Sequence, residues 1–212
     1  MDLMQRMTGL LVGAVFGAVF VVVNARGPLD PVTANVLRAA ACLAAAAVLA
    51  MWFRTARRER PGRAAPAARR GMFGAGYLAV VVAEAVLLFG GLRVLAALGR
   101  PEEGNVGWVA FVVGVHFVAL APIWKDWSIA VPGVALTLLG AGGLVLAATP
   151  AVAWVPIVSG VLSGVVLLAG SLTFGWRGLA RPTTCPGRRA ARLLLSHRPP
   201  DTLCDELITF CR

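Results

Sequence analysis

Two ionisable side chains lie in the middle of apolar stretches of this chain. Glu84 lies in the run AEAVLLFGGLRVL, which also contains Arg93, and His116 lies in a later apolar run. Imidazole and carboxyl groups are the side chains that most often exchange protons in proteins, so the two together would form a proton relay. An ionised carboxylate is costly in hydrocarbon, so we expect Glu84 to be protonated, paired or next to water.

The elements that hold these residues follow from composition. The chain has 212 residues, of which 58% are hydrophobic and 14% are charged, whereas about 25% is usual for charged residues in a soluble domain. Six segments have the length of ~17–25 apolar residues that crosses a bilayer. These segments span residues 7–23, 32–53, 73–98, 106–123, 127–148 and 151–174. None alternates in polarity as a barrel strand would, so we predict an all-α, polytopic transmembrane helical bundle.

Positive charge predicts the topology. The segment RTARRERPGRAAPAARR follows the second span, and the positive-inside rule places it in the cytoplasm. Both termini are then cytoplasmic, and Arg26 and Arg100 are the only basic residues in the outer loops. The net charge of +10 therefore gathers at the ends of spans on one side, which favours anionic lipid over nucleic acid as its partner. We expect a multi-pass protein of the plasma membrane.

The chain divides into a transmembrane domain, residues 1–175, and a basic cytoplasmic tail, residues 176–212. The tail is expected to be flexible, and its arginines either lie on anionic lipid or remain in solvent. Its three cysteines and one histidine lack a CxxC spacing, so no metal and no cofactor is predicted. The first span also resembles a signal peptide, but its apolar run is longer than the usual ~7–15 residues, which favours a retained helix.

Glu84 and His116 are expected at similar depths, because spans three and four form an antiparallel hairpin with a short connection. They are candidates for a proton-carrier pair; the alternatives are an interhelical hydrogen bond with a structural role, or no contact. Arg93 points to the opposite face of its helix from Glu84, because about 100° separates successive residues. Arg93 and Arg38 both lie near the outer ends of spans. They either extend to the outer surface or form an outward-facing anion or lipid-headgroup site.

Small residues predict where helices pack closely. Glycines recur at four-residue spacing in the first span and again in the sixth, and such faces let two backbones approach each other. The candidates are Gly9, Gly13, Gly17, Gly160 and Gly164. Their partner is either another helix of this chain, a second copy in a homo-oligomer, or another membrane protein.

The segments MTGLLVGAVFGAVFVVVNA and NVGWVAFVVGVHFVALAPIW resemble small multi-spanning membrane proteins of actinobacteria. This resemblance covers about residues 1–170; it implies a plasma-membrane location and no particular activity. No HExxH, GxSxG or Walker pattern occurs, so we do not expect an enzyme. The first functional hypothesis is a small proton-coupled transporter or permease, and the second is a structural or accessory membrane protein.

Overall fold

The computed structural model describes residues 3–58 and 74–180, and no strand occurs within these two ranges. The six long helices are α1 (Leu3–Asn24), α2 (Pro31–Arg58), α4 (Ala75–Ala97), α5 (Gly104–Trp124), α6 (Ala130–Leu146) and α7 (Leu162–Ala180). Two 3₁₀ turns, η2 (Trp127–Ile129) and η3 (Val152–Trp154), precede α6 and η4, and η4 (Pro156–Val161) is a π-helix that leads into α7.

Six helical segments are long and apolar enough to cross a membrane, which confirms the predicted helical class and the number of candidate spans. They are Met7–Asn24, Pro31–Arg57, Ala75–Ala97, Gly104–Trp124, Trp127–Leu146 and Val152–Arg177. The segment predicted at residues 151–174 is not one regular helix, because η3, η4 and α7 follow one another within it. Pro156 begins the π-helix; its missing N–H cannot take part in the ordinary hydrogen-bond ladder.

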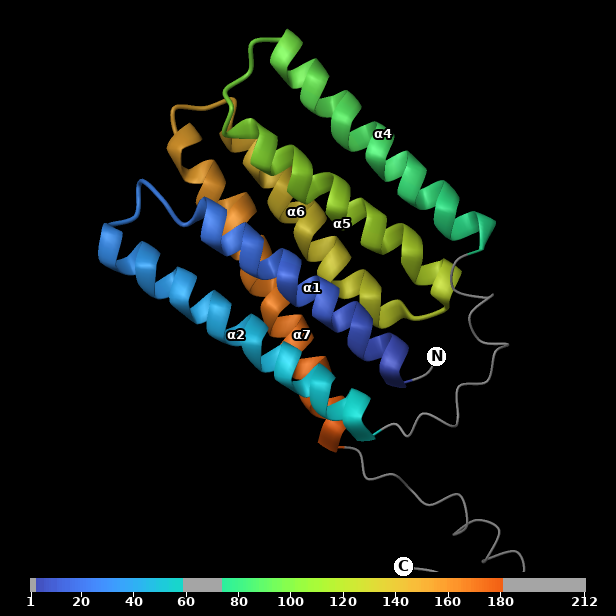
Figure 1. The fold of residues 1–212 in the computed structure, drawn as a ribbon. Coiled ribbons are helices and arrows are strands. Elements are labelled where there is room, and N and C mark those ends of the chain that lie inside the picture. Colours follow the sequence, from blue (N-terminus) through green and yellow to red (C-terminus); the bar gives the residue numbers. More distant parts are fainter. Residues whose placement is uncertain (1–2, 59–73, 181–212) are drawn as a thin grey trace, which may run out of the picture. The chain divides into compact units, whose positions relative to one another are not determined.

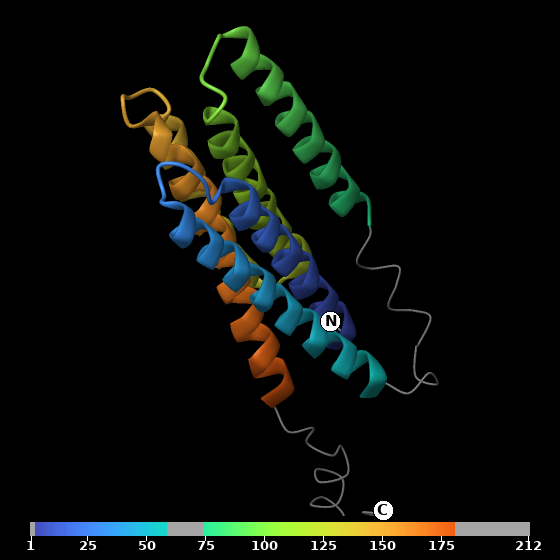
Figure 2. The same cartoon turned by 60° about the vertical axis from the view of Figure 1, so that its left-hand side comes forward.

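Successive helices alternate in direction, so that the first residues of α1 and the last residues of α7 lie at the same end of the helical bundle (Figures 1 and 2). This bundle belongs to one compact unit, Met1–Leu179, and the rest of the chain forms a second unit, Ala180–Arg212. Helix α7 continues to Ala180, past the predicted start of the tail at residue 176. The predictions for the tail cysteines and tail arginines beyond Ala180 lie outside the described residues.

Helices α1 and α2 share an apolar seam whose residues recur every seven positions. Such a repeat keeps one face of each helix in contact with its neighbour along several turns. The buried members of the seam are Met7, Ala14 and Val21 on α1 and Ala34, Ala41 and Val48 on α2. Val161 and Leu168 join the same cluster from η4 and α7, which therefore lie against this helical pair.

Helices α5 and α6 approach each other through glycines that also recur every seven positions. Gly107 and Gly114 lie on α5, and Gly133 and Gly140 lie on α6. A Cβ atom on Gly107 would come within 3.1 Å of the Leu144 amide nitrogen. The two backbones are thus in direct contact, which is how helices associate where lipid removes the hydrophobic drive between them.

Helix α4 packs on α5 and contributes no buried residue to the bundle. Figures 1 and 2 show α4 beside α5 and away from α2, which lies next to α1. Most of its large apolar side chains are exposed, including Leu78, Val82, Val86, Phe89 and Val94. Lipid or another helix must cover this surface in a membrane.

Candidate functional site

Three contacts join α4 to α5 at successive levels. Near one end the rings of Tyr77 and Trp124 stack with centroids 6.1 Å apart. Toward the other end the Trp108 indole lies on Gly91, which leaves no room for a Cβ atom, and Trp108 Nε1 donates to the carbonyl of Leu87 at 3.0 Å. Between Tyr77 and Gly91, α4 has room for one further contact with α5 at an intermediate level.

Glu84 and His116 form that middle level. Nδ1 of His116 lies 2.9 Å from Oε2 of Glu84, and the two side chains are 13% and 24% exposed, respectively. The ring N–H is not aligned with the carboxylate oxygen, so Nδ1 lacks a well-directed hydrogen bond although the ion-pair distance is met. The rings of His116 and Phe117 also form a T-shaped contact, with centroids 5.9 Å apart.

The pair has few charged neighbours. Glu84 is the single acidic residue and His116 the single histidine within the six candidate spans. The other charged residue of α4 is Arg93, while α5 and α6 contain none besides His116. A proton on this pair therefore changes the charge of an otherwise nearly neutral region, where such a change has a large energetic effect.

Arg38, a residue of α2, contacts the C-terminal end of α1. Its guanidinium donates to the Val22 carbonyl at 3.2 Å and to the Ala25 carbonyl at 2.7 Å. These carbonyl groups lie at the C-terminal end of α1 and accept no hydrogen bond from a later turn of the helix, so a cation is favourable there. The sequence did not predict this role, because the contact forms only when the loop between α1 and α2 reverses the chain and brings α2 back along the end of α1.

Arg93 is exposed and has no hydrogen bond or ion pair within the described chain. It lies on α4, whereas Arg38 lies on α2, and the two helices are on different sides of the bundle (Figure 1). The structure therefore does not bring the two arginines together into one anion site.

Four of the five candidate packing glycines lie where α1 meets the sixth segment. A Cβ atom on Gly17 would lie 2.8 Å from the Gly164 carbonyl oxygen, and one on Gly13 would lie 3.1 Å from the hydroxyl of Ser171. Gly160 lies directly on the side chain of Asn24. Gly9 differs, because nothing lies within 4 Å of its Cβ position. The partner of the first glycine face is thus a helix of the same chain.

Buried polar side chains surround the π-helix; the sequence placed Ser159 and Ser163 on a packing face but predicted neither their hydrogen bonds nor the burial of Asn24. Ser159 is fully buried and its hydroxyl donates to the Leu139 carbonyl at 2.8 Å, while Asn24 donates to the Phe20 carbonyl at 2.8 Å. The hydroxyl of Ser163 and the Oδ1 atom of Asn24 are buried without a partner. The signal in the sequence was the four-residue repeat of serine beside glycine, which marks a packed helix face.

A cavity of about 220 Å³ lies at the loop end of the bundle that includes the α4–α5 connection. It is lined by Arg26, Gly27, Glu102, Glu103, Ala153 and Pro156. A groove of about 590 Å³ lies at the other end, between α2 and α7. Neither of them contains Glu84 or His116. Within the described ranges, no three metal-ligating side chains gather in one place.

Comparison of the chain with family models, with curated proteins and with solved structures found no match.

Proposed function

We propose that this protein crosses the plasma membrane six times and works as a small proton-coupled transporter or permease. Glu84 is the proton carrier and His116 is its partner. The observation that supports this proposal is the 2.9 Å contact between the two side chains in the middle of two apolar helices. Ionisable residues at such positions are rare and are usually functional, because they are expensive to place there.

The proposed orientation puts the starts of α1 and α4 and the ends of α2 and α7 in the cytoplasm. The described basic residues at that end of α2 and α7 are Arg54, Arg57, Arg58 and Arg177. At the other end Arg26 and Arg100 lie among the acids of the loops. The excess of arginine on one side fits the positive-inside rule.

Protonation of the pair formed by Glu84 and His116 would change the packing of α4 on α5. With one added proton the pair is net neutral, whereas loss of that proton leaves a net negative charge, in contact with only a neutral imidazole N–H, in a region of low dielectric. Because α4 has no buried residue, its displacement would break few apolar contacts. Proton transfer and movement of α4 are therefore coupled, and this coupling would let a proton gradient drive alternate opening of the bundle.

The first test asks whether Glu84 exchanges protons with bulk water. Infrared spectra of the carboxyl stretch would be recorded on reconstituted protein between about pH 5 and pH 9. We expect a titrating band that disappears in Glu84→Gln and persists in Glu103→Gln, whose carboxyl lies in a loop. Absence of a Glu84-dependent band across this range would remove the proton carrier and refute the proposal.

The second test concerns transport. Vesicles containing the protein and an internal pH indicator would be screened with small solutes under an imposed pH gradient. A solute that changes the internal pH with wild type, and not with Glu84→Gln, identifies the substrate class.

A second candidate function is supported by the surface of α4. A helix with no buried residue and with several exposed large apolar side chains is suited to contact another membrane protein. In this accessory role, Glu84 and His116 serve only to hold α4 on α5. A membrane protein that co-purifies in stoichiometric amount, and that remains bound to Glu84→Gln, would favour the accessory role over transport.

A further inference from the structure

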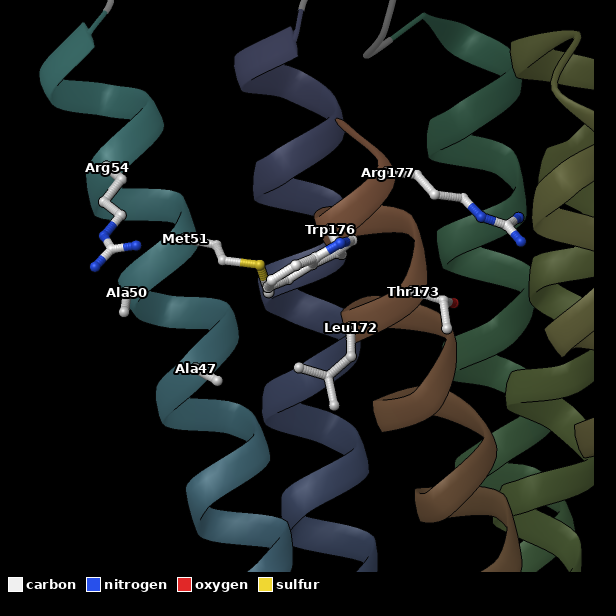
Figure 3. Close-up of a pocket in the computed structure, with 8 residues that line it drawn as sticks. All are labelled: Ala47, Ala50, Met51, Arg54, Leu172, Thr173, Trp176 and Arg177. Atoms are coloured by element: carbon white, nitrogen blue, oxygen red, sulfur yellow. The ribbon is translucent and has the colours of Figure 1, made fainter. Parts of the chain in front are cut away.

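A groove of about 590 Å³ separates the last turns of α2 from those of α7 (Figure 3). Its lining residues are Ala47, Ala50, Met51, Arg54, Leu172, Thr173, Trp176 and Arg177. The floor is apolar: Met51 is 9% exposed, and Figure 3 shows its sulfur directed toward Trp176 and Leu172 between the two helices. A floor of this kind fits a hydrocarbon chain.

Positive charge lies on both sides of this floor. Arg54 comes from α2 and Arg177 from α7; Figure 3 shows Met51, Trp176 and Leu172 between them, with the Arg177 side chain directed away from Arg54. Neither arginine has a hydrogen bond or ion pair with a described residue. The helices around the groove, α1, α2, η4 and α7, contain no aspartate or glutamate. Among the described residues of these helices there is thus no counter-charge for the two guanidinium groups.

In the proposed membrane placement, the groove lies at the level of the lipid headgroups. Arg57 and Arg177 end the second and sixth candidate spans, so both helices leave the apolar region at this level. Trp176 is 72% exposed there, and tryptophan prefers the boundary between hydrocarbon and headgroups. A ligand in this position would have its apolar part in the bilayer and its charged part at the surface.

We propose that the groove binds an anionic phospholipid of the cytoplasmic leaflet. One acyl chain lies on Ala47, Met51 and Leu172, and the anionic headgroup lies at the surface end of the groove, attracted by the charges of Arg54 and Arg177 on its two sides. An acyl chain accounts for the apolar floor, which a free phosphate would not use, and the phosphate accounts for the two arginines without counter-ions. This inference depends on the membrane placement proposed above and is independent of proton transport.

Selectivity for anionic lipid should depend on both arginines. A basic side chain near an anionic surface changes lipid affinity by about fivefold, so loss of one arginine should reduce selectivity about fivefold and loss of both about 30-fold. Arginine also binds phosphate through two parallel hydrogen bonds, which lysine cannot form. Replacement of both arginines by lysine should therefore keep part of the selectivity.

The test uses the full chain in vesicles and Trp176 as the reporter. Phospholipids with brominated acyl chains quench tryptophan fluorescence on contact. Quenching would be compared for brominated phosphatidylglycerol and brominated phosphatidylcholine, and the contribution of Trp176 would be obtained by subtraction of the Trp176→Phe signal. The variants are Arg54→Gln with Arg177→Gln, the corresponding double lysine variant, and Arg57→Gln as the control. Arg57 is exposed at the same end of α2 and does not line the groove.

We expect stronger quenching of Trp176 by phosphatidylglycerol, loss of that preference in the double glutamine variant, partial retention in the lysine variant and full retention in Arg57→Gln. Equal quenching by the two lipids in wild type would overturn the proposal, as would an equal loss in Arg57→Gln, which would indicate diffuse surface attraction. Absence of any Trp176 quenching would mean that protein covers the groove and would also overturn it. Failure of the protein to float with the vesicles would instead refute the membrane placement.

Discussion

Replacement of Gly17 by alanine tests the contact between α1 and the sixth segment. The added Cβ atom would lie 2.8 Å from the Gly164 carbonyl oxygen, 3.0 Å from Cγ of Leu168 and 3.1 Å from Cβ of Leu167. Ordinary van der Waals contact begins at 3.4 Å, so the helices must separate by about 0.6 Å at this point. Two of the three neighbours are a backbone oxygen and a Cβ atom, which cannot move without their helix.

The expected loss of stability follows from this displacement. Overpacking of a close contact costs about 1–3 kcal/mol. Alanine also favours the helix over glycine by about 1 kcal/mol, which offsets part of the loss. Gly9→Ala, on the same helix, provides the control, because nothing lies within 4 Å of the Gly9 Cβ position. The difference in unfolding free energy between the two variants removes the helix-propensity gain and should be about 1–3 kcal/mol.

The assay is reversible unfolding in mixed micelles, with increasing mole fraction of sodium dodecyl sulfate and tryptophan fluorescence as the signal. Gly17→Ala should unfold at lower detergent fraction than wild type, and Gly9→Ala at an equal or higher fraction. Equal stability of the two variants would refute the contact between Gly17 and Gly164. Destabilisation by Gly9→Ala that depends on protein concentration would show that Gly9 faces a second copy.

Three further predictions concern polar contacts. A double-mutant cycle with Glu84→Ala and His116→Ala should give a coupling energy of about 0.6–1.7 kcal/mol in the same unfolding assay, and a coupling of zero would mean that the two side chains do not interact. Arg38→Gln should lower stability by about 1–3 kcal/mol, because hydrogen bonds from a charged group to the end of α1 are lost; the matched change at exposed Arg93 should alter stability by less than about 0.5 kcal/mol, and equal effects would contradict the capping role. Hydrogen bonds with Thr33, first from its side chain and then from its backbone, hold the pKa of Asp30 below its usual value. A lowered folded-state pKa gives stability that is present above the unfolded pKa and is lost as the pH falls through the folded pKa, so Asp30→Ala should be destabilising near pH 7 and progressively less so in acid. Thermal unfolding of wild type and Asp30→Ala, near pH 7 and in acid, checks this prediction. A difference in stability between the two proteins that does not change with pH would contradict it.

Hydropathy was sufficient to predict the helices, because each must satisfy its own backbone hydrogen bonds in lipid and needs a minimum apolar length. The ends of α4 at Ala75 and Ala97 fall close to the predicted limits of 73 and 98. The similar depth of Glu84 and His116 also followed from sequence, since a short connection fixes the register of an antiparallel hairpin. The seven-residue spacing of Met7, Ala14 and Val21 was present in the sequence and went unused.

The tertiary structure decided which helix faces which. Gly17 and Gly164 lie far apart in the chain, and nothing in their local sequences names the other as a partner; only the sum of contacts along both helices selects that pairing. The role of Arg38 was also decided by the tertiary structure, because the chain reverses after α1 and brings Arg38 of α2 to the end of α1. Lipid covers apolar side chains on every face equally well, so hydrophobicity determines that a segment spans the membrane but not how it is turned. Close backbone approach and buried polar contacts make that choice, and they exist only once the helices have assembled.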